Sequence, residues 1–379
     1  MFFHIGHPLN PSQILIATVR LLIFFILLSE IIFAEVVINQ CFVSFKEKLP
    51  IKAKEEIENK YKLTKLKDFI LTRASLYETT STLPIEEIIS LLRQEDTVLF
   101  ADFNHIQHTQ SVGLNEPRLG EQWYLDNLGK PVNFRQTKQG SDIGWTEAMS
   151  RYSPRQQRVV VSVIDTGISA DHPEIKDRRA YMPAELNGIQ GVDDDGLGYV
   201  DDKYGWDFIG NDNDPSDLNG HGTQVAGILA AHSKNELGIS GIAPNAVILP
   251  MRVFNEYGGG ATDDRILSAL GYSILGGVRI INLSLGKGSA FSIPIQDALY
   301  NLEKNFDVLL ICAAGNGGED GRGDNLETTP FYPASYLGNV ILSVAATDEN
   351  DELAIFSNFG KETVDLAAPG VNMLTPDLS

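Results

Sequence analysis

The 379-residue sequence contains only two cysteines, Cys41 and Cys312. They cannot form a disulfide framework, and they lie in segments that we expect to fold as different units. We therefore interpret both as small apolar side chains that pack in the interior. Without disulfides the fold must rest on a hydrophobic core, and a chain that is 43% hydrophobic can bury a sizeable one.

Positive charge is also scarce, because 30 lysines and arginines stand against 50 aspartates and glutamates and the net charge is −20. A protein that binds nucleic acid needs clustered Lys and Arg to neutralise phosphates, so the charge argues against nucleic acid as a partner. Anionic membrane surfaces are disfavoured for the same reason. The acidic balance fits a soluble protein or one that collects cations.

An apolar run extends from Leu21 to Ala34, preceded by Arg20 and interrupted by Glu30. The run is short for a membrane span and is typical of the core of a secretory signal. We therefore predict a signal peptide over residues 1–34 and a secreted, extracellular or periplasmic protein. The alternative is that this segment stays uncleaved and anchors the N-terminus in a membrane.

The rest of the chain shows two patterns. Residues 36–109 alternate strand-like and helix-like stretches and predict a small α/β unit, followed by a polar linker over residues 110–122. From residue 123 to residue 379, short β-branched runs alternate with helical segments. Such continuous apolar runs are expected of strands buried on both faces of a parallel sheet. We predict a three-layer α/β fold with a mostly parallel sheet, and ligands at the carboxyl ends of its strands.

Three polar residues lie together at one edge of the predicted sheet, where its strands end. Asp165 ends the strand "VVVSVID", His221 lies between glycines at a helix start, and Asn316 follows the strand "LLICAAGN". Each alone is a weak signal, since an Asp or His in such a place often only caps a turn or helix. Together a carboxylate, an imidazole and an amide donor match the parts of an acyl-transfer site.

The stretches "VVVSVIDTGISADHPEI", "NGHGTQVAGILAA" and "CAAGN" resemble the subtilisin-like serine proteases, the subtilases. The stretches "INLSLG", "GISGIAP" and "VDLAAPG" extend the resemblance over about residues 115–371. It implies hydrolysis of polypeptide substrates, with Asp165 as the triad aspartate, His221 as the general base and Asn316 as the oxyanion donor. It also implies that residues 36–109 are a pro-region, which acts as intramolecular chaperone and inhibitor of a zymogen.

The resemblance also suggests how a peptide would bind. Two segments would pair with the substrate backbone, where glycines allow a close approach. A third segment would form the floor of the main specificity pocket. The residues of these segments are Gly258, Gly259, Gly260, Ser284, Leu285 and Gly286 for the pairing edges and Ala313, Ala314 and Gly315 for the pocket floor.

In subtilases the "AAPG" stretch is followed by a Gly-Thr-Ser-x-Ala motif that carries the nucleophile, and this motif does not follow Gly370 here. We expect a chain truncated before the catalytic serine, with only the Asp and His of the triad and no activity of its own. The alternative is a non-catalytic pseudoprotease or remnant that binds peptides or calcium without hydrolysis.

Nine aspartates lie between residues 193 and 217 against the single Lys203. Oxygen-rich loops of this kind suit structural Ca²⁺, so we predict calcium as a cofactor. The resemblance points to Asp207, Asp212 and Asp214 as one site and to Glu174 with Asn235 as a second. The alternative interpretation is a solvated acidic loop with Asp-Gly turns.

Overall fold

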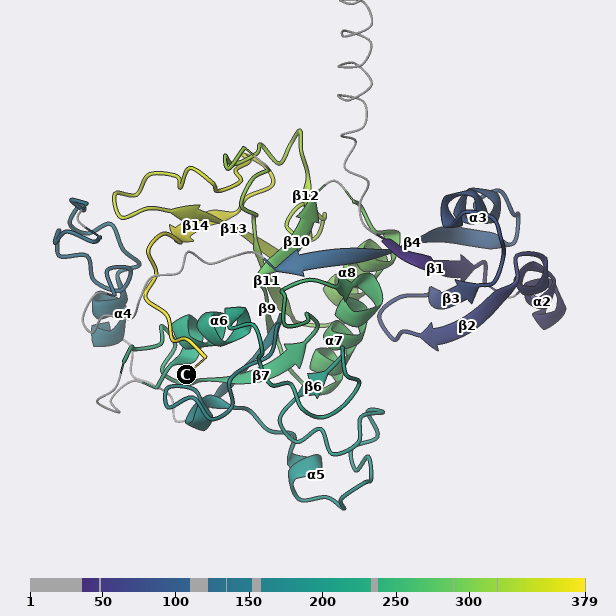
Figure 1. Cartoon of the computed structure of the whole chain (residues 1–379), viewed down its shortest axis with the longest axis horizontal. Helices are drawn as coiled ribbons and strands as arrows, with labels where there is room; N and C mark the ends of the chain where they lie inside the picture. Colours follow the sequence, from purple (N-terminus) through teal and green to yellow (C-terminus); the bar gives the residue numbers. More distant parts are fainter. Residues whose placement is uncertain are drawn as a thin grey trace, which may run out of the picture. The chain divides into compact units, whose positions relative to one another are not determined.

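The computed structural model describes residues 36–47, 49–109, 122–133, 135–151, 158–232, 238–288, 290–318 and 320–378 (Figure 1). The predicted signal segment and nearly all of the predicted linker lie outside these residues. Glu35–Ser379 forms one compact unit. In the part of the chain that the structure describes, no helix has both the length and the apolar character needed to cross a membrane.

The N-terminal segment, residues 36–109, folds as two helices on a small antiparallel sheet. Leu63, Ile85 and Leu92 belong to its own buried core, between the helices and one face of that sheet. Both helices follow a proline, Pro50 or Pro84, whose fixed φ suits a helix start. The elements are β1 (Val36–Phe45), α2 (Ile51–Lys60), β2 (Leu63–Asp68), β3 (Ser75–Thr79), α3 (Ile85–Leu92) and β4 (Val98–Thr109).

A parallel seven-stranded sheet in the order β14-β13-β11-β9-β5-β7-β6 forms the centre of the remaining chain. This confirms the predicted α/β fold with a mostly parallel sheet. The β-branched runs become its inner strands because both of their faces are covered. The strands are β5 (Val159–Asp165), β6 (Trp206–Asp207), β7 (Ala246–Arg252), β9 (Ile280–Leu283), β11 (Leu309–Ala313), β13 (Ile341–Thr347) and β14 (Leu366–Pro369).

Helices cover the two faces of this sheet. Val161 and Val163 of β5 pack in one cluster with α6 (His221–Ala230), whereas the neighbouring Ile164 packs in another with α7 (Asp263–Leu275) and α8 (Ile293–Asn305). The alternation along β5 therefore produces three layers. Short helical segments outside the layers are α4 (Trp145–Arg151), η1 (Lys176–Arg178) and α5 (Pro183–Leu186).

Strand β4 joins the N-terminal segment to the rest of the unit. It pairs antiparallel with β1 on one side, and its far end pairs with β8 (Ala261–Thr262) and β10 (Leu285–Gly288). β10 in turn pairs with β12 (Phe331–Tyr332). The core cluster of α7 and α8 also contains Phe42 and Leu76 from the N-terminal sheet. The two parts are thus joined by both backbone pairing and a shared apolar core.

Candidate active site

Asp165 and His221 meet at the carboxyl end of the parallel sheet, as the sequence pattern predicts. His221 Nδ1 lies 2.7 Å from Asp165 Oδ1, and both side chains are buried. Asp165 ends β5, and His221 is the first residue of α6. A buried carboxylate at this distance orients the imidazole and stabilises its protonated form. The pair can therefore accept a proton from a group at the other ring nitrogen.

The position of His221 depends on residues that the sequence analysis missed. Asp217 Oδ1 accepts hydrogen bonds from the backbone N–H groups of Asn219 and Gly220, and its Oδ2 accepts from the N–H and hydroxyl of Thr223. These bonds cap the first turn of α6. Gly220 has a φ of +106°, which explains the glycine before the histidine. The sequence signal was present, because Asp217 comes shortly before a helix start.

Close contacts hold the start of α6 near Asp165. A Cβ on Gly222 would lie 2.1 Å from the carbonyl oxygen of Gly167, so only glycine fits there. In addition, the N–H of Gly222 donates to Thr166 Oγ1 at 2.9 Å. The Gly-His-Gly stretch therefore places the imidazole against the turn that follows β5.

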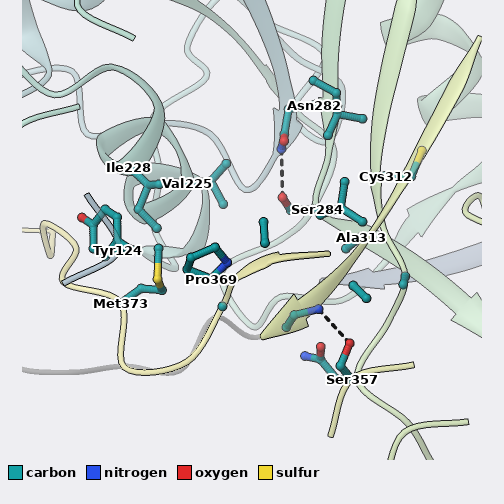
Figure 2. A pocket seen from close by; sticks show the side chains of 18 of the residues that line it. Tyr124, Val225, Ile228, Asn282, Ser284, Cys312, Ala313, Ser357, Pro369 and Met373 are labelled. Atoms are coloured by element: carbon teal, nitrogen blue, oxygen red, sulfur yellow. Dashed lines mark hydrogen bonds between the residues drawn. The ribbon is translucent and has the colours of Figure 1, made fainter. Parts of the chain in front are cut away.

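The predicted pocket floor lines a cavity of about 380 Å³ (Figure 2). Ser284, the segment Ala313–Ala314–Gly315 and Asn316 all contribute to its wall, together with apolar side chains of α6 such as Val225 and Ile228. Gly315 has a φ of +102°, and a Cβ there would meet the side chain of Asn358. The structure thus groups Asn316 with the expected pocket residues at the sheet edge that also carries Asp165.

The two predicted pairing edges both adjoin strands that pair with the chain's own β4. Leu285 and Gly286 of β10 pair with Thr109 and His108, and β8, which directly follows Gly258, Gly259 and Gly260, pairs with Gln107 and Ile106. A Cβ on Gly286 would lie 2.2 Å from the Phe331 ring, so the glycine is required. An extended strand occupies the place that the resemblance assigns to a substrate backbone.

The candidate metal ligands differ in their surroundings. The buried Asp207 accepts a hydrogen bond at 2.5 Å from Arg252, which neutralises it, while Asp212 and Asp214 are exposed. Asp212 and Asp214 accept backbone hydrogen bonds within their own turns. Glu174 is buried and its Oε1 accepts from the N–H of Ile239. Its proposed partner Asn235 lies outside the described residues.

The sequence of residues 156–378 matches the family model described as "Subtilase family". This match covers more than half of the chain. The chain belongs to the subtilase family. The strands and helices above are those of a subtilisin-like fold.

Curated relatives agree with this assignment. Thermophilic serine proteinase of Bacillus sp. (strain AK1) is 37% identical over 57% of this chain and 44% of its own length. Thermitase of Thermoactinomyces vulgaris is 37% identical over 55% of this chain and 62% of its own length. The chain thus spans about half the length of these relatives.

A solved structure supports the fold of a larger part of the subtilase chain. Fervidolysin from Fervidobacterium pennivorans, a keratinolytic enzyme related to subtilisin, aligns with a TM-score of 0.61 over 88% of this chain and 47% of its own, at 17% identity. At this identity the likeness concerns the fold alone. The structural alignment covers more of this chain than the family-model match does. The likeness of fold therefore extends beyond residues 156–378.

Proposed function

We propose that the protein is an exported subtilisin-like endopeptidase that hydrolyses peptide bonds with an Asp/His/Ser triad. The observation that carries the proposal is the buried 2.7 Å contact between Asp165 Oδ1 and His221 Nδ1 at the carboxyl end of β5. In this mechanism His221 takes the proton from a serine hydroxyl and later gives it to the leaving amine. Asp165 keeps the imidazole oriented and stabilises its positive charge. We assign the nucleophilic serine to no residue of this sequence.

Asn316 is proposed as the donor that stabilises the oxyanion, because an amide aimed at developing negative charge lowers the barrier. Its place on the cavity wall beside Ala314 and Gly315 supports this role. The mostly apolar lining of the cavity supports its assignment as a specificity pocket for an apolar side chain of a polypeptide substrate.

Residues 36–109 are proposed to be an intramolecular chaperone and inhibitor. Support comes from β4, whose end pairs with both β8 and β10, where glycine-rich edges lie. A strand bound there excludes a substrate strand from the same backbone groups. The shared core of Phe42 and Leu76 with α7 and α8 supports a role in folding, since it buries apolar surface of both parts.

Structural calcium and export complete the proposal. The aspartates of the insert supply hard oxygen ligands, which suit Ca²⁺. The apolar run before residue 35 supports export, with membrane attachment through an uncleaved segment as the alternative.

The test uses the full-length product of the gene. Cleavage of unfolded casein is measured together with labelling by a fluorophosphonate, and the labelled residue is identified by mass spectrometry. We expect one labelled serine, and His221→Ala should reduce cleavage and labelling by at least about 10³-fold. Asp165→Asn should have a similar effect, because it favours the wrong tautomer of the imidazole.

Asp171→Asn is the matched control, since it makes the same change at an exposed carboxylate and should leave both readouts unchanged. Cleavage that survives His221→Ala would contradict the proposed mechanism. Peptide binding without labelling in the unmodified protein would instead support the pseudoprotease alternative.

A further inference from the structure

A second cavity, of about 370 Å³, lies beside the amino ends of β5 and β7. Arg158 in its lining directly precedes β5. Arg178, also in the lining, contacts Pro244, which comes two residues before β7. Asp165 ends β5 on the other side of the sheet, roughly 20 Å away at about 3.3 Å per residue. The cavity is therefore separate from the candidate active site.

Positive charge gathers in the lining of this cavity, which we call the basic cavity after its four cationic side chains. Among the described residues of the lining, Asp177 is the only carboxylate, and it is exposed. The chain as a whole carries a net charge of −20, so a local excess of positive charge is unusual for it. Like charges repel one another unless a negative partner is present. The four cations are Arg158, Lys176, Arg178 and Arg179.

The described part of the chain supplies no such partner. None of the four cations lies within ion-pair distance of a described carboxylate. Arg178 Nη1 donates to the carbonyl oxygen of Pro244 at 2.7 Å, but Nε of both Arg178 and Arg179 is buried without a partner. Buried donors are normally paired, because an unpaired one is unfavourable. The edges through which a guanidinium binds an oxyanion with two N–H groups are thus unused.

Neighbouring groups hold the two arginines without using these donors. The guanidinium carbon of Arg179 lies 4.2 Å from the centroid of the Tyr204 ring. This cation–π contact engages the face of the guanidinium and leaves its N–H edge available. Burial and the charge of Arg158 lower the pKa of Arg178, and the charge of Asp177 only partly offsets this. An anion in the cavity would relieve this repulsion.

We propose that the basic cavity binds a phosphate group, free or carried by a small molecule, with Arg158, Arg178 and Arg179 as its main donors. The planar fork of arginine matches phosphate oxygens, and Lys176 adds a point charge. Pockets of about 300–1,000 Å³ hold small ligands, so the space also accommodates the molecule that carries the phosphate. The negative net charge repels large polyanions, and the assignment is therefore to a small ligand.

The bound phosphate joins three segments of the chain. They are the end of η1 at Arg178, the start of β5 after Arg158, and His232, which follows α6. A ligand that binds the folded state alone raises its stability. Binding is therefore measurable without peptidase activity, so that this proposal and the proposed function can fail independently.

Calorimetry and melting temperatures of the full chain test the proposal, with inorganic phosphate, pyrophosphate and phosphoserine as probes. Each probe is compared with sodium chloride at equal ionic strength. A chelator is present throughout, so that phosphate cannot act by removing calcium. We expect one saturable site and a rise in melting temperature that chloride does not produce. Binding of phosphoserine supports a phosphorylated molecule as the ligand, whereas binding of the inorganic probes alone supports the free ion.

Arg158→Gln and Arg179→Gln each remove one positive charge from the basic cavity. Each should weaken phosphate binding at least about tenfold, because a hydrogen bond between charged groups is lost. Arg322→Gln is the matched control, since it makes the same change at an exposed arginine outside the lining. It should bind phosphate like the unmodified chain.

The proposal is overturned if no probe binds, or if chloride at equal ionic strength has the same effect. It is also overturned if both cavity variants bind phosphate with unchanged affinity, or if Arg322→Gln weakens binding as much as they do. Arg158 is exposed, so its substitution removes no buried contact. Arg158→Gln therefore decides the question even if Arg179→Gln fails to fold.

Discussion

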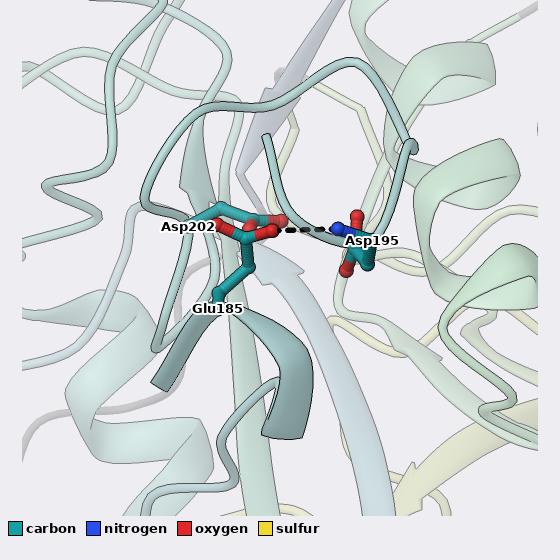
Figure 3. A group of neighbouring side chains, drawn as sticks. All are labelled: Glu185, Asp195 and Asp202. Carbon is teal, nitrogen blue, oxygen red and sulfur yellow. Dashed lines mark hydrogen bonds between the residues drawn. The ribbon is translucent and has the colours of Figure 1, made fainter. Parts of the chain in front are cut away.

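Two groups of carboxylates in this subtilase differ in how their negative charge is balanced. One, here called the interface cluster, consists of Asp102, His105, Asp263 and Lys287, where the N-terminal segment meets α7 and β10. Lys287 Nζ donates to Asp263 at 3.0 Å, and both side chains are buried. Among the residues that the structure describes, no lysine or arginine pairs with the second group, Glu185, Asp195 and Asp202 of the acidic insert, here called the insert cluster (Figure 3). Buried charge is therefore balanced from within the chain at one place and left open at the other.

The pKa values follow this difference. Burial raises the pKa of Asp202 to about 6, and the charges of Asp195 and Glu185 add to the effect. Burial also lowers the pKa of Lys287, and the negative charge of Asp263 partly offsets this lowering. A cluster that carries its own cation stabilises one arrangement of the chain. The stability of a cluster without an internal cation depends on the protons and cations in the solution.

The largest effect should come from removing the internal cation. Lys287→Met leaves the carboxylate of Asp263 buried without its lysine, which typically costs about 3–5 kcal/mol. The free energy of unfolding from urea titrations measures this loss. Lys361→Met is the matched control, because the side chain of Lys361 is 91% exposed and pairs only at the surface. Equal stability of the two variants would show that Lys287 does not balance this cluster.

Lowering the pH should have a smaller effect, which acts through His105 of the interface cluster on the docking of β4. Burial lowers the pKa of His105 to about 4 from the ordinary 6.5. The docked state therefore disfavours the protonated imidazole, and docking of β4 should weaken as pH falls from about 6.5 toward 4. From pH 6.5 to 5 the loss should be roughly tenfold in the docking equilibrium. Hydrogen exchange of the β4 and β10 amides, corrected for intrinsic rates, measures it.

His105→Leu is the variant that isolates this contribution, since it fills a buried position without a titrating group. Burial also raises the pKa of Asp102, which favours docking at low pH and opposes the histidine. The difference between the two proteins, and not the profile of either alone, therefore reports on His105. An identical pH dependence in both would exclude the histidine as its cause.

The smallest effect, and the only one that should change sign, concerns the insert cluster. In a chelator Asp202→Asn should raise the free energy of unfolding by about 1 kcal/mol, because it removes a repulsive buried charge. In excess Ca²⁺ the same variant should be less stable than the unmodified chain, which gains stability from the bound ion. Melting temperatures under both conditions, with Asp171→Asn at an exposed carboxylate as the control, measure this. A variant that destabilises equally under both conditions would argue against a bound cation.

Much of the central fold could be predicted from the sequence, because its signals are local. The β-branched runs that became β5, β7 and β11 are unambiguous where both faces of a strand are buried. Asp165 and His221 were predictable because parallel strands bring their carboxyl ends to one edge. The flanking glycines marked the same place. Their φ values and close contacts are requirements that few other residues meet.

The charged clusters were not predictable, because they depend on which carboxylate faces which partner. Asp207 and Asp202 lie five residues apart in an equally acidic stretch. One meets Arg252 from a distant strand and the other meets Glu185 from a helix before the aspartate run. Nothing in the local pattern distinguishes them. The balance of Asp263 by Lys287 similarly needs the packing of α7 against β10.

The pairing of β4 with β8 and β10 has a consequence for competition. Because all three strands belong to one chain, the effective concentration of β4 at these edges is on the order of millimolar. A free peptide at micromolar concentration would therefore be outcompeted by about a thousandfold at equal intrinsic affinity. A single break in the chain after β4 would make the same contact bimolecular. Its occupancy would then fall on dilution, so that leaving a crowded compartment would itself free the two edges.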